Sequence, residues 1–174
     1  MSNISTKTAM YSIYDKTNGK TKYIGDTNSY KRPDIEMLTD TFTGTGIMGE
    51  IDIPTVGQIG AMEGELGFNK TTVEMADLFA PGVHTIESRW VTSVMDTATG
   101  NIRMQGNKEI IKIQPKKISL GEVKSNETNE ASMTYEILSY QYLIDGKTII
   151  KIDKLNFVFI INGVDYTESI RKLL

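Results

Sequence analysis

The chain has 174 residues, of which 39% are hydrophobic and 24% are charged, and its formal net charge is −3. This length is enough for one domain with a real core, and we expect residues 1–174 to form a single domain. The mildly acidic balance argues against a dedicated nucleic-acid-binding protein. The absence of cysteine excludes disulfides, thiolate nucleophiles and zinc-thiolate sites.

Neither a membrane span nor a secretion signal is expected. No stretch approaches the roughly 18 consecutive apolar residues that a transmembrane helix requires. Residues 1–16 lack a basic segment followed by an apolar core, which is the pattern of a signal peptide. The cysteine-free composition also fits synthesis in a reducing cytosol.

The dominant hydrophobic periodicity of the amino-terminal half is two, which is typical of strands. Asn18-Gly19 lies between two alternating runs and predicts a tight hairpin turn. Residues 71–80 differ, because their apolar positions have near-helical spacing and Pro81-Gly82 follows, so a short helix is predicted there. The strands expected in this half are residues 10–14, 21–24, 35–43, 47–53 and 59–68.

The carboxy-terminal half predicts longer strands. Gly106 is a candidate bulge position, and Pro115 is expected to end its strand. The polar residues 121–130 are expected to form an exposed loop. Asp145-Gly146 and Asn162-Gly163 are signals of tight turns between strands. The strands expected in this half are residues 83–95, 102–114, 131–144 and 147–161.

The stretch TGTGIMGEIDIP contains Gly44-x-Gly46-x-x-Gly49, which is the spacing of a dinucleotide-binding fingerprint. That chemistry needs a helix to open at the third glycine, so that its free N–H groups face the pyrophosphate. The residues after Gly49 instead alternate between charged and β-branched side chains and reach Pro54, which predicts a strand. We therefore interpret the glycines as a turn and expect no bound cofactor.

Catalytic constellations are nearly absent from the sequence. His84 is the one histidine, it has no second ligand nearby in sequence, and we interpret it as a strand-edge surface residue. The segment from Asp96 to Gly100 predicts a turn rather than a calcium loop. The pairs Glu63/Glu65 and Glu50/Asp52 share strand faces and are interpreted mainly as charged stripes, although such pairs can bind a cation or act as acid and base.

Charge is distributed unevenly along the chain. Residues 34–77 contain nine acids and one base, whereas residues 103–117 contain five bases and the single acid Glu109. Two solvated faces would explain this pattern. The alternative is that the acidic segment of one copy meets the basic segment of another, because complementary patches fix register and orientation.

The last hairpin has apolar residues on both faces of its strands. Simple alternation places Tyr135, Ile137 and Leu143 on one face of their strand. It places the following residues on the other face: Leu138, Tyr140, Tyr142 and Ile144. Strands that are apolar on both faces are covered on both faces, so we infer that other subunits supply part of the cover.

The carboxy-terminal third contains the segments YEILSYQYLIDGK, IKIDKLN and INGVDY, and the segments GIMG, IDIP and MEGEL lie upstream in that order. Together they resemble the major tail tube proteins of contractile-tailed phages and of phage-tail-like bacteriocins (R-type tailocins). The resemblance covers most of residues 34–166 and is weaker over the first 30 residues. The family-like structural turns are at Gly46, Gly49, Asp145, Gly146, Asp153, Gly163 and Asp165.

The resemblance implies a mainly β subunit, a β-barrel or sandwich with one flanking helix. Six copies would form a ring in which the strands close a continuous barrel, and rings would stack into a tube inside a contractile sheath. The first 30 and last 8 residues are candidates for inter-subunit arms, although the terminal TESIRKLL also suits a helical turn. The subunit would be made in the bacterial cytoplasm and end in the virion or particle, with no enzymatic activity and no cofactor.

The implied partners are other copies, the sheath protein, baseplate and tail terminator proteins, and phage DNA in transit through the lumen. From the charge pattern we expect inter-subunit contacts at Lys108, Lys112, Lys116, Lys117, Asp34 and Glu36. We expect acids in the lumen, where they would repel phosphate, at Glu50, Asp52, Glu63 and Glu65, with Glu36 and Asp40 as further candidates.

Three alternatives stay open at this point. The tube of a type VI secretion system or a related injection system would share the fold. A β-sandwich carbohydrate- or ligand-binding module would use the tyrosines and Trp90. A hydrolase would use the paired carboxylates. A phage tube and the tube of a genome-free bacteriocin cannot be separated on these residues.

Overall fold

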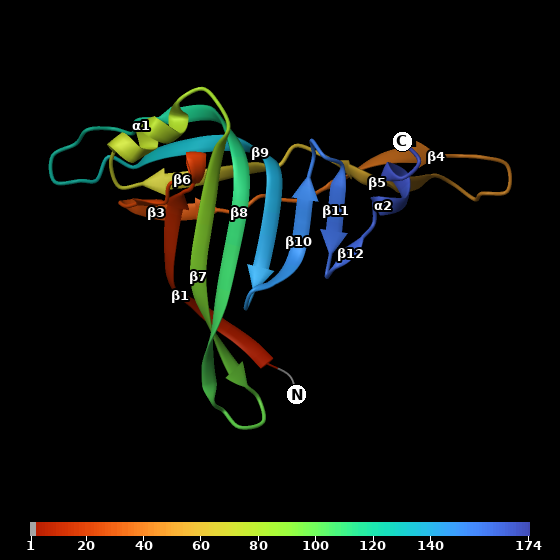
Figure 1. The fold of residues 1–174 in the computed structure, drawn as a ribbon, viewed down its shortest axis with the longest axis horizontal. Helices are drawn as coiled ribbons and strands as arrows, with labels where there is room; N and C mark the ends of the chain where they lie inside the picture. Colours follow the sequence, from red (N-terminus) through yellow and green to blue (C-terminus); the bar gives the residue numbers. More distant parts are fainter. Residues whose placement is uncertain (1–2) are drawn as a thin grey trace.

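The computed structural model describes residues 3–174, which fold mainly as antiparallel β-structure (Figure 1). The strands are β1 (Asn3–Asp15), β2 (Lys22–Ile24), β3 (Thr27–Lys31), β4 (Met37–Phe42), β5 (Ile51–Ile59), β6 (Glu63–Phe68), β7 (His84–Asp96), β8 (Ile102–Ser119), β9 (Ala131–Ile144), β10 (Lys147–Asp153), β11 (Val158–Ile161) and β12 (Val164–Asp165). The helices are a 3-10 turn η1 (Thr17–Gly19), α1 (Val73–Phe79) and α2 (Glu168–Arg171).

The main sheet has the order β12-β11-β10-β9-β8-β7-β1-β2, so that neighbours in sequence are mostly neighbours in space. Tight turns explain this meander. Asp145 and Gly146 both have positive φ, at 47° and 81°, as a two-residue turn between twisted strands requires. Asn18 and Gly19 also have positive φ, at 58° and 73°, in the longer connection between β1 and β2, and the pairing of these strands confirms the predicted amino-terminal hairpin.

The long strand β9 takes part in two layers. Its first half pairs with β6, which in turn pairs with β3, and its second half pairs with β10. In Figure 1, β3 and β6 run across β1 and β7 near the end where α1 lies. The core fills the space between these layers with Ile13, Ile24, Leu66, Phe68, Ile86, Ile111, Met133 and Ile137, all buried.

The helix predicted over residues 71–80 is confirmed as α1. Thr72 caps it by accepting a hydrogen bond from the Met75 N–H at 3.2 Å, and Met75 and Leu78 are buried in the core. Pro81 and Gly82 follow the last turn. Among the helices of residues 3–174, none is long and apolar enough to cross a membrane.

A closed barrel is not formed by one copy of the chain. Within residues 3–174, β2 pairs with β1 and β3 pairs with β6, but no hydrogen-bonded pairing joins β2 to β3. The strands β4 and β5 form a separate two-stranded sheet. The mainly β prediction with a flanking helix is confirmed, whereas the sheets of the single chain remain open.

Three local predictions were wrong, each because strand pairing outweighed a local signal. Strand β8 does not end at Pro115 but continues to Ser119, and a register shift between Pro115 and Lys117 accommodates the proline. Gly106 is not a bulge in the β7–β8 ladder, since it pairs in register with Val91. The run 147–161 is two strands, because Asp153 accepts hydrogen bonds from the Leu155 and Asn156 N–H groups and forms a turn.

The parity predicted for β9 was wrong as well. Lys112 pairs with Ser139 while the next residue, Ile113, pairs with Ile137, so Leu138 is left without a partner in the β8–β9 ladder. An extra residue of this kind reverses the faces beyond it. Tyr140 therefore faces the core together with Ile137, and both are buried.

Candidate functional site

A hairpin projects far from the body of the molecule at the right of Figure 1. It consists of β4 and β5 with their flanking residues, and we call residues 33–61 the arm. Its tip contains Gly46 and Gly49 with φ of 96° and 106°, and strand β5 follows rather than a helix. This confirms the prediction of a turn at these glycines. Exposed apolar side chains of the arm are Ile35, Leu38, Phe42, Met48, Ile51, Ile53 and Val56.

The arm rests on the carboxy-terminal segment near its middle. Gly57 has φ of 81°, and a Cβ placed there would lie 2.6 Å from Thr167 Cγ2 and 3.2 Å from the Phe157 ring. Only glycine permits both this backbone conformation and this close approach. The sequence does not single out Gly57, because its contact partner lies 110 residues away.

A polar cluster holds the segment on which the arm rests. Arg171 Nη2 lies 2.5 Å from Asp165 Oδ2, and Arg171 Nη1 donates to the Phe157 carbonyl oxygen at 2.8 Å. The Asp165 carboxylate also accepts from the Thr167 N–H and hydroxyl. The Arg171 guanidinium, joined by the Thr167 donors, lowers the pKa of Asp165 to about 2 although partial burial opposes ionisation. The predicted turn residue Asp165 is therefore an ion-pair partner as well.

The base of the arm carries a buried carboxylate. Glu109, on β8, is fully buried and accepts hydrogen bonds from Tyr30 Oη at 2.6 Å, from Arg32 Nε at 2.6 Å and from the Tyr140 hydroxyl. Arg32 Nη2 also lies 2.6 Å from Glu109 Oε1. Burial, followed by the charge of Glu109, raises the pKa of the Tyr140 phenol, so this hydroxyl stays a donor.

Two aromatic rings complete this site. Trp90 and Tyr142 stack with ring centroids 5.6 Å apart, and the Arg32 guanidinium lies over both, 4.9 and 4.6 Å from their centroids. Tyr142 donates a hydrogen bond to Asn107 Oδ1 at 2.8 Å. Arg32 thus combines an ion pair with cation–π contacts, which a lysine could not reproduce with the same geometry.

Sequence reasoning missed this site. Its one available signal is that Glu109 is the lone acid in the basic segment and shares parity with Ile111 and Ile113, which places it on the apolar face of β8. Two further facts could not be predicted from the sequence. The unpaired Leu138 turns Tyr140 toward Glu109, and Arg32, which binds Glu109, lies 77 residues away from it in the sequence.

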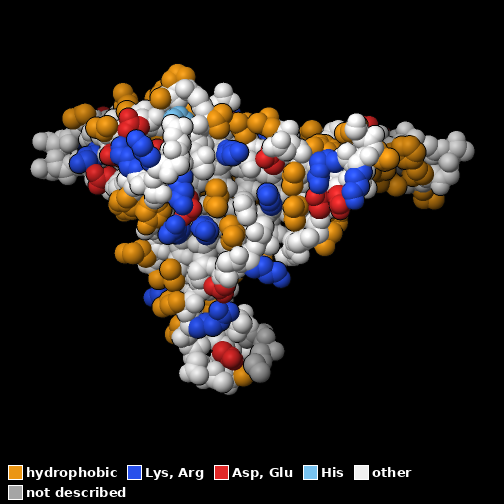
Figure 2. All heavy atoms as spheres, in the orientation of Figure 1, with side chains coloured by type: hydrophobic (Ala, Val, Ile, Leu, Met, Phe, Trp, Pro, Cys, Tyr) orange, Lys and Arg blue, Asp and Glu red, His pale blue; other side chains and the backbone are white. Residues whose placement is uncertain are grey.

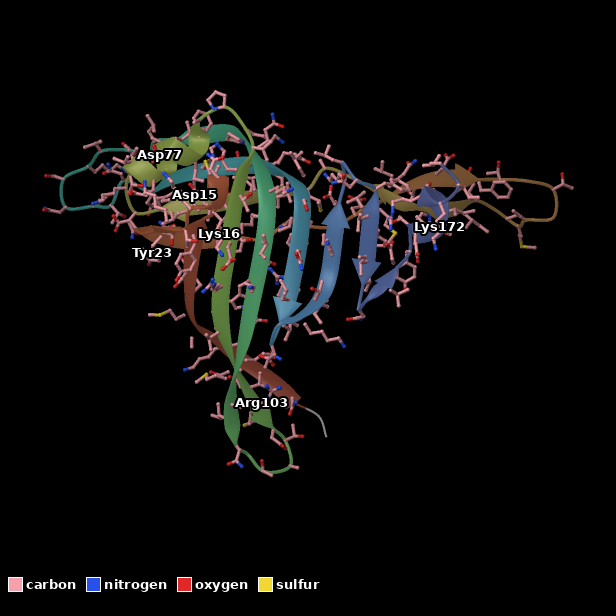
Figure 3. All side chains as sticks on the ribbon, in the orientation of Figure 1. Asp15, Lys16, Tyr23, Asp77, Arg103 and Lys172 are labelled. Atoms are coloured by element: carbon pink, nitrogen blue, oxygen red, sulfur yellow. The ribbon has the colours of Figure 1, made fainter. Side chains whose placement is uncertain are left out.

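A second apolar surface lies on the lower part of the sheet, far from the arm. Directly paired residues of β1, β7 and β8 place its members on one face of the sheet. We call it the apolar stripe, and it consists of Ile4, Met10, Val91, Ile102 and Met104, all exposed. In Figure 2, hydrophobic side chains gather along the left edge of the lower part of the sheet, above the hairpin of β7 and β8, and on the arm. Figure 3 shows the distance between the two apolar surfaces, with Arg103 on the hairpin of β7 and β8 and Lys172 beside the arm.

The same face of the sheet carries cations above the stripe. Glu87 is buried there, with Lys16 Nζ 2.9 Å from its Oε2 and Arg89 Nε 2.5 Å from its Oε1. Burial opposes ionisation of Glu87, but hydrogen bonds from Lys16 and Arg89 lower its pKa overall. Lys108 lies opposite Arg89, and Lys112 lies opposite Thr85 on this face.

The residues predicted to make inter-subunit contacts lie in different places. Lys116 Nζ is 2.8 Å from Glu63 Oε2 of the same chain, so an acidic and a basic segment already meet within one copy. This pair lowers the pKa of Glu63 and raises that of Lys116. Lys117 lies next to Lys116 on β8, and Asp34 and Glu36 begin the arm.

The predicted lumen acids form two separate groups. Glu50 and Asp52 lie near the tip of the arm, where Asp52 accepts a hydrogen bond from the Thr41 hydroxyl at 2.8 Å. Glu63 and Glu65 lie on β6, and Glu65 pairs with Lys31 of β3 in the sheet. The structure therefore does not bring the four acids together. Asp40 is on β4 of the arm.

The remaining candidate residues have local roles. His84 Nε2 lies 2.8 Å from the Ala80 carbonyl oxygen at the start of β7. Asp96 accepts hydrogen bonds from the N–H groups of Ala98 and Thr99, which confirms the predicted turn. Over residues 3–174, no group of three or more His, Asp or Glu side chains is arranged to hold a metal ion.

Residues 15–174 match the family model of the phage tail tube protein FII. The tail tube protein of Escherichia phage P2 is 26% identical over 152 residues, which cover 86% of this chain and 87% of that relative. Among solved structures, the sheath/tube terminator of an extracellular contractile injection system (PVC) in the extended state has a similar fold, with a TM-score of 0.51 at 13% identity over 78% of this chain and 94% of that one. This chain therefore belongs to the phage tail tube protein FII family and is a structural subunit of a contractile-tail tube.

Proposed function

We propose that copies of this tube subunit extend one another's sheets into a closed ring, and that the rings stack into a hollow tube. The observation that carries this proposal is the unfinished edge of β1. Residues 3–12 of β1 pair with β7 on one side, whereas β2 covers the other side only from Ile13 to Asp15. An edge of this length is a template for another strand unless something covers it.

The opposite end of the sheet supports the same arrangement. There the sheet ends at β11 and at β12, which has two residues. The edge of β1 in one copy can therefore continue the sheet of the next copy from that end. Repetition of this step around an axis closes a barrel made from several subunits, which removes the free edges at the two ends of the main strand order.

The two exposed apolar surfaces also favour a head-to-tail contact. The arm and the apolar stripe lie at different ends of the molecule, so neither can cover the other within one copy. Contacts between two different surfaces of identical subunits generate rings when the rotation closes and open stacks when it does not. Both outcomes are needed in a tube of stacked rings.

The finer assignments follow from the family resemblance and the charge pattern. Six copies would form each ring, and sheath, baseplate and terminator proteins would be partners, with DNA passing through the lumen if the particle is a phage. The acids of β6 and the arm would face the lumen, and Lys108, Lys112, Lys116 and Lys117 would meet Asp34 and Glu36 of a neighbour. The subunit would be made in the bacterial cytoplasm, and its role is mechanical rather than enzymatic.

Two alternatives lose their support in the structure. A carbohydrate-binding module would need free aromatic faces, but Trp90 and Tyr142 stack on each other and on Arg32. A hydrolase would need a free carboxylate pair, but Glu63 of one candidate pair is bound to Lys116, and Asp52 of the other accepts a hydrogen bond from the Thr41 hydroxyl.

A genome-free particle would use the same tube, and the presence or absence of packaged DNA in purified particles separates it from a phage.

The test is a pair of charges placed in the apolar stripe. Met10→Glu with Met104→Glu alters side chains that are 72% and 61% exposed, so the subunit should fold as before. Wild-type protein should form rings or hollow rods in negative-stain images, and the double variant should sediment as a monomer with an unchanged circular dichroism spectrum. Val123→Glu, at a side chain that is 86% exposed on the 121–130 loop, is the matched control. Rods of the double variant at wild-type yield would show that the apolar stripe makes no contact with a neighbour, and wild-type protein that stays monomeric would overturn the proposal.

A further inference from the structure

Two short connecting segments join the arm to the body of the subunit. We call residues 32–36 the first leg and residues 60–62 the second leg. The first leg begins at Arg32, directly after Lys31, where β3 makes its last pair with β6. The second leg ends at Met62, whose side chain is fully buried. The legs are joined by a hydrogen bond from the Gly60 N–H to the Glu36 carbonyl oxygen at 2.9 Å. The direction of the arm therefore depends on how these two legs are held, together with the close approach of Gly57 to Thr167 and Phe157.

The second leg is held by the core. Met62 fills a core position, its N–H donates to Glu136 Oε1 at 3.2 Å, and its carbonyl oxygen accepts from the Ile137 N–H at 2.8 Å. The first leg has no buried apolar residue before Met37, which packs against the core at the start of β4, and Arg32 and Pro33 both lie near the surface. Pro33 restricts the backbone of Arg32 to extended conformations, which stiffens the leg without fastening it to the sheet.

The side chain of Arg32 supplies that fastening. Its guanidinium binds the buried Glu109 through Nε and Nη2, both at 2.6 Å, and its Nη2 donates to the Tyr140 hydroxyl at 3.1 Å. Trp90 and Tyr142 lie under its flat face. Contacts in several directions fix the position of the group as well as its charge.

Such a pair is a costly way to gain stability. Removing a carboxylate from water has a large desolvation penalty, and a buried ion pair is often replaced by uncharged residues without loss of stability. Its best-attested benefit is a unique geometry. The pair here lies where a unique geometry matters, because the arm is a long lever and a small change at its base displaces the tip by a large distance.

We propose that Arg32 and Glu109 are positioning residues that set the direction of the arm and thereby make the subunit competent to join a neighbour. The inference rests on the proposed assembly into rings and stacks. Without the pair, the arm is held only by the core contacts of Met37 and Met62 and by the contact of Gly57 with Thr167, so its direction varies more and the fraction of subunits in the assembling direction falls. If that fraction becomes one tenth, the apparent affinity between subunits falls about tenfold.

Three variants separate positioning from stability. Arg32→Met alone leaves Glu109 buried and unpaired, so it should lower the melting temperature as well as assembly. Arg32→Met with Glu109→Gln removes both charges and keeps an acceptor for Tyr30 and Tyr140, so it should recover most of the lost melting temperature while the assembled fraction stays low. Arg32→Lys keeps the charge but loses the paired contacts and should be intermediate in assembly. Lys22→Met, which removes an exposed cation paired with Asp77, is the matched control and should change neither property.

The direction of the arm can be measured without reference to assembly. Because the chain has no cysteine, Asp40→Cys on the arm and Lys151→Cys on β10 give two unique spin-label positions. Labelled protein is diluted with unlabelled protein so that only distances within one copy contribute. The distance distribution should be narrow in otherwise wild-type protein and broad in the uncharged double variant.

The outcomes distinguish the inference from the proposed function. A narrow distribution and normal assembly in the double variant would overturn the positioning role while leaving ring formation intact. A broad distribution with normal assembly would also overturn it, because arm direction would then not limit assembly. Failure of wild-type protein to assemble would contradict the proposed function, and the distance measurement would still decide whether the pair fixes the arm.

Discussion

Tyr135 and Tyr140 face the same core although five positions separate them along β9, an odd spacing that normally places side chains on opposite faces. The unpaired Leu138 reverses the faces between them. The two hydroxyls then meet different surroundings. The Tyr140 hydroxyl donates to Glu109, whereas the Tyr135 hydroxyl is buried without a hydrogen-bond partner anywhere in residues 3–174.

We expect Tyr135→Phe and Tyr140→Phe to change stability in opposite directions. Removing the Tyr140 hydroxyl deletes a hydrogen bond to a charged group, which should lower the free energy of unfolding by about 1.5–3 kcal/mol. Removing the Tyr135 hydroxyl deletes a buried group without a partner and should raise it by about 1 kcal/mol. Urea denaturation of both variants measures the two free energies of unfolding. The slope of the free energy of unfolding against urea concentration should be unchanged. Equal losses in the two variants would contradict the assignment.

Gly57→Ala should be costly because the arm passes so close to Thr167. The new Cβ would lie 2.6 Å from Thr167 Cγ2 on a backbone with φ of 81°. Gly46→Ala is the control, since Gly46 has φ of 96° but nothing within 4 Å of the position that a methyl group would take. We expect a loss of about 1 kcal/mol for Gly46→Ala from backbone strain alone, and about 2–4 kcal/mol for Gly57→Ala. Similar melting temperatures for the two variants would show that the contact with Thr167 is not tight.

The ion pair between Asp165 and Arg171 predicts a pH dependence. Because the folded pKa of Asp165 is about 2, below its ordinary value of 3.8, the stabilisation is complete above about pH 4 and is lost as the pH falls toward 2. Asp165→Asn lacks this ionisation. The melting temperature of the wild type should therefore exceed that of Asp165→Asn at pH 5, and the difference should shrink steadily between pH 4 and pH 2. A difference that is constant over this range would remove the ion pair as its cause.

Charge reversal on β8 tests whether basic residues meet a neighbouring subunit. Lys116 and Glu63 are both half-exposed, so water screens their pair and breaking it with Lys116→Glu should change the stability of the subunit little. Lys116→Glu with Lys117→Glu should nevertheless reduce tube yield if these cations face acids of another copy.

The swap Lys116→Glu with Glu63→Lys separates the two possibilities, because it restores the pair within the chain and keeps the reversed charge at position 116. Sedimentation of assembled protein measures the yield of each variant. Normal yield in the Lys116→Glu, Lys117→Glu variant would remove these residues from the subunit contact. Recovery of yield by the swap would show that the pair within one copy is what matters.

The sequence predicted most strands because alternation and turn chemistry are local. Asp145-Gly146, Asn18-Gly19 and the Thr72 cap each act within a few residues, and all three behave as their residue types require. The prediction from sequence failed where the neighbouring strand determines the extent or register of a strand. Pro115 is a strong local signal against a strand, but the neighbouring β9 holds it in place through a register shift. A pattern within one segment contains no information about the register of another.

By itself, the sequence determined that the chain is mainly β, where its turns and one helix lie, and which family it resembles. Only the tertiary structure decided that Arg32 reaches Glu109, that Gly57 lies against Thr167, and that one copy leaves the edge of β1 unpaired. The physical reason is range. Turn and capping preferences act between neighbours along the chain, whereas a buried ion pair, a close backbone approach and a free strand edge depend on which distant segments the fold brings together.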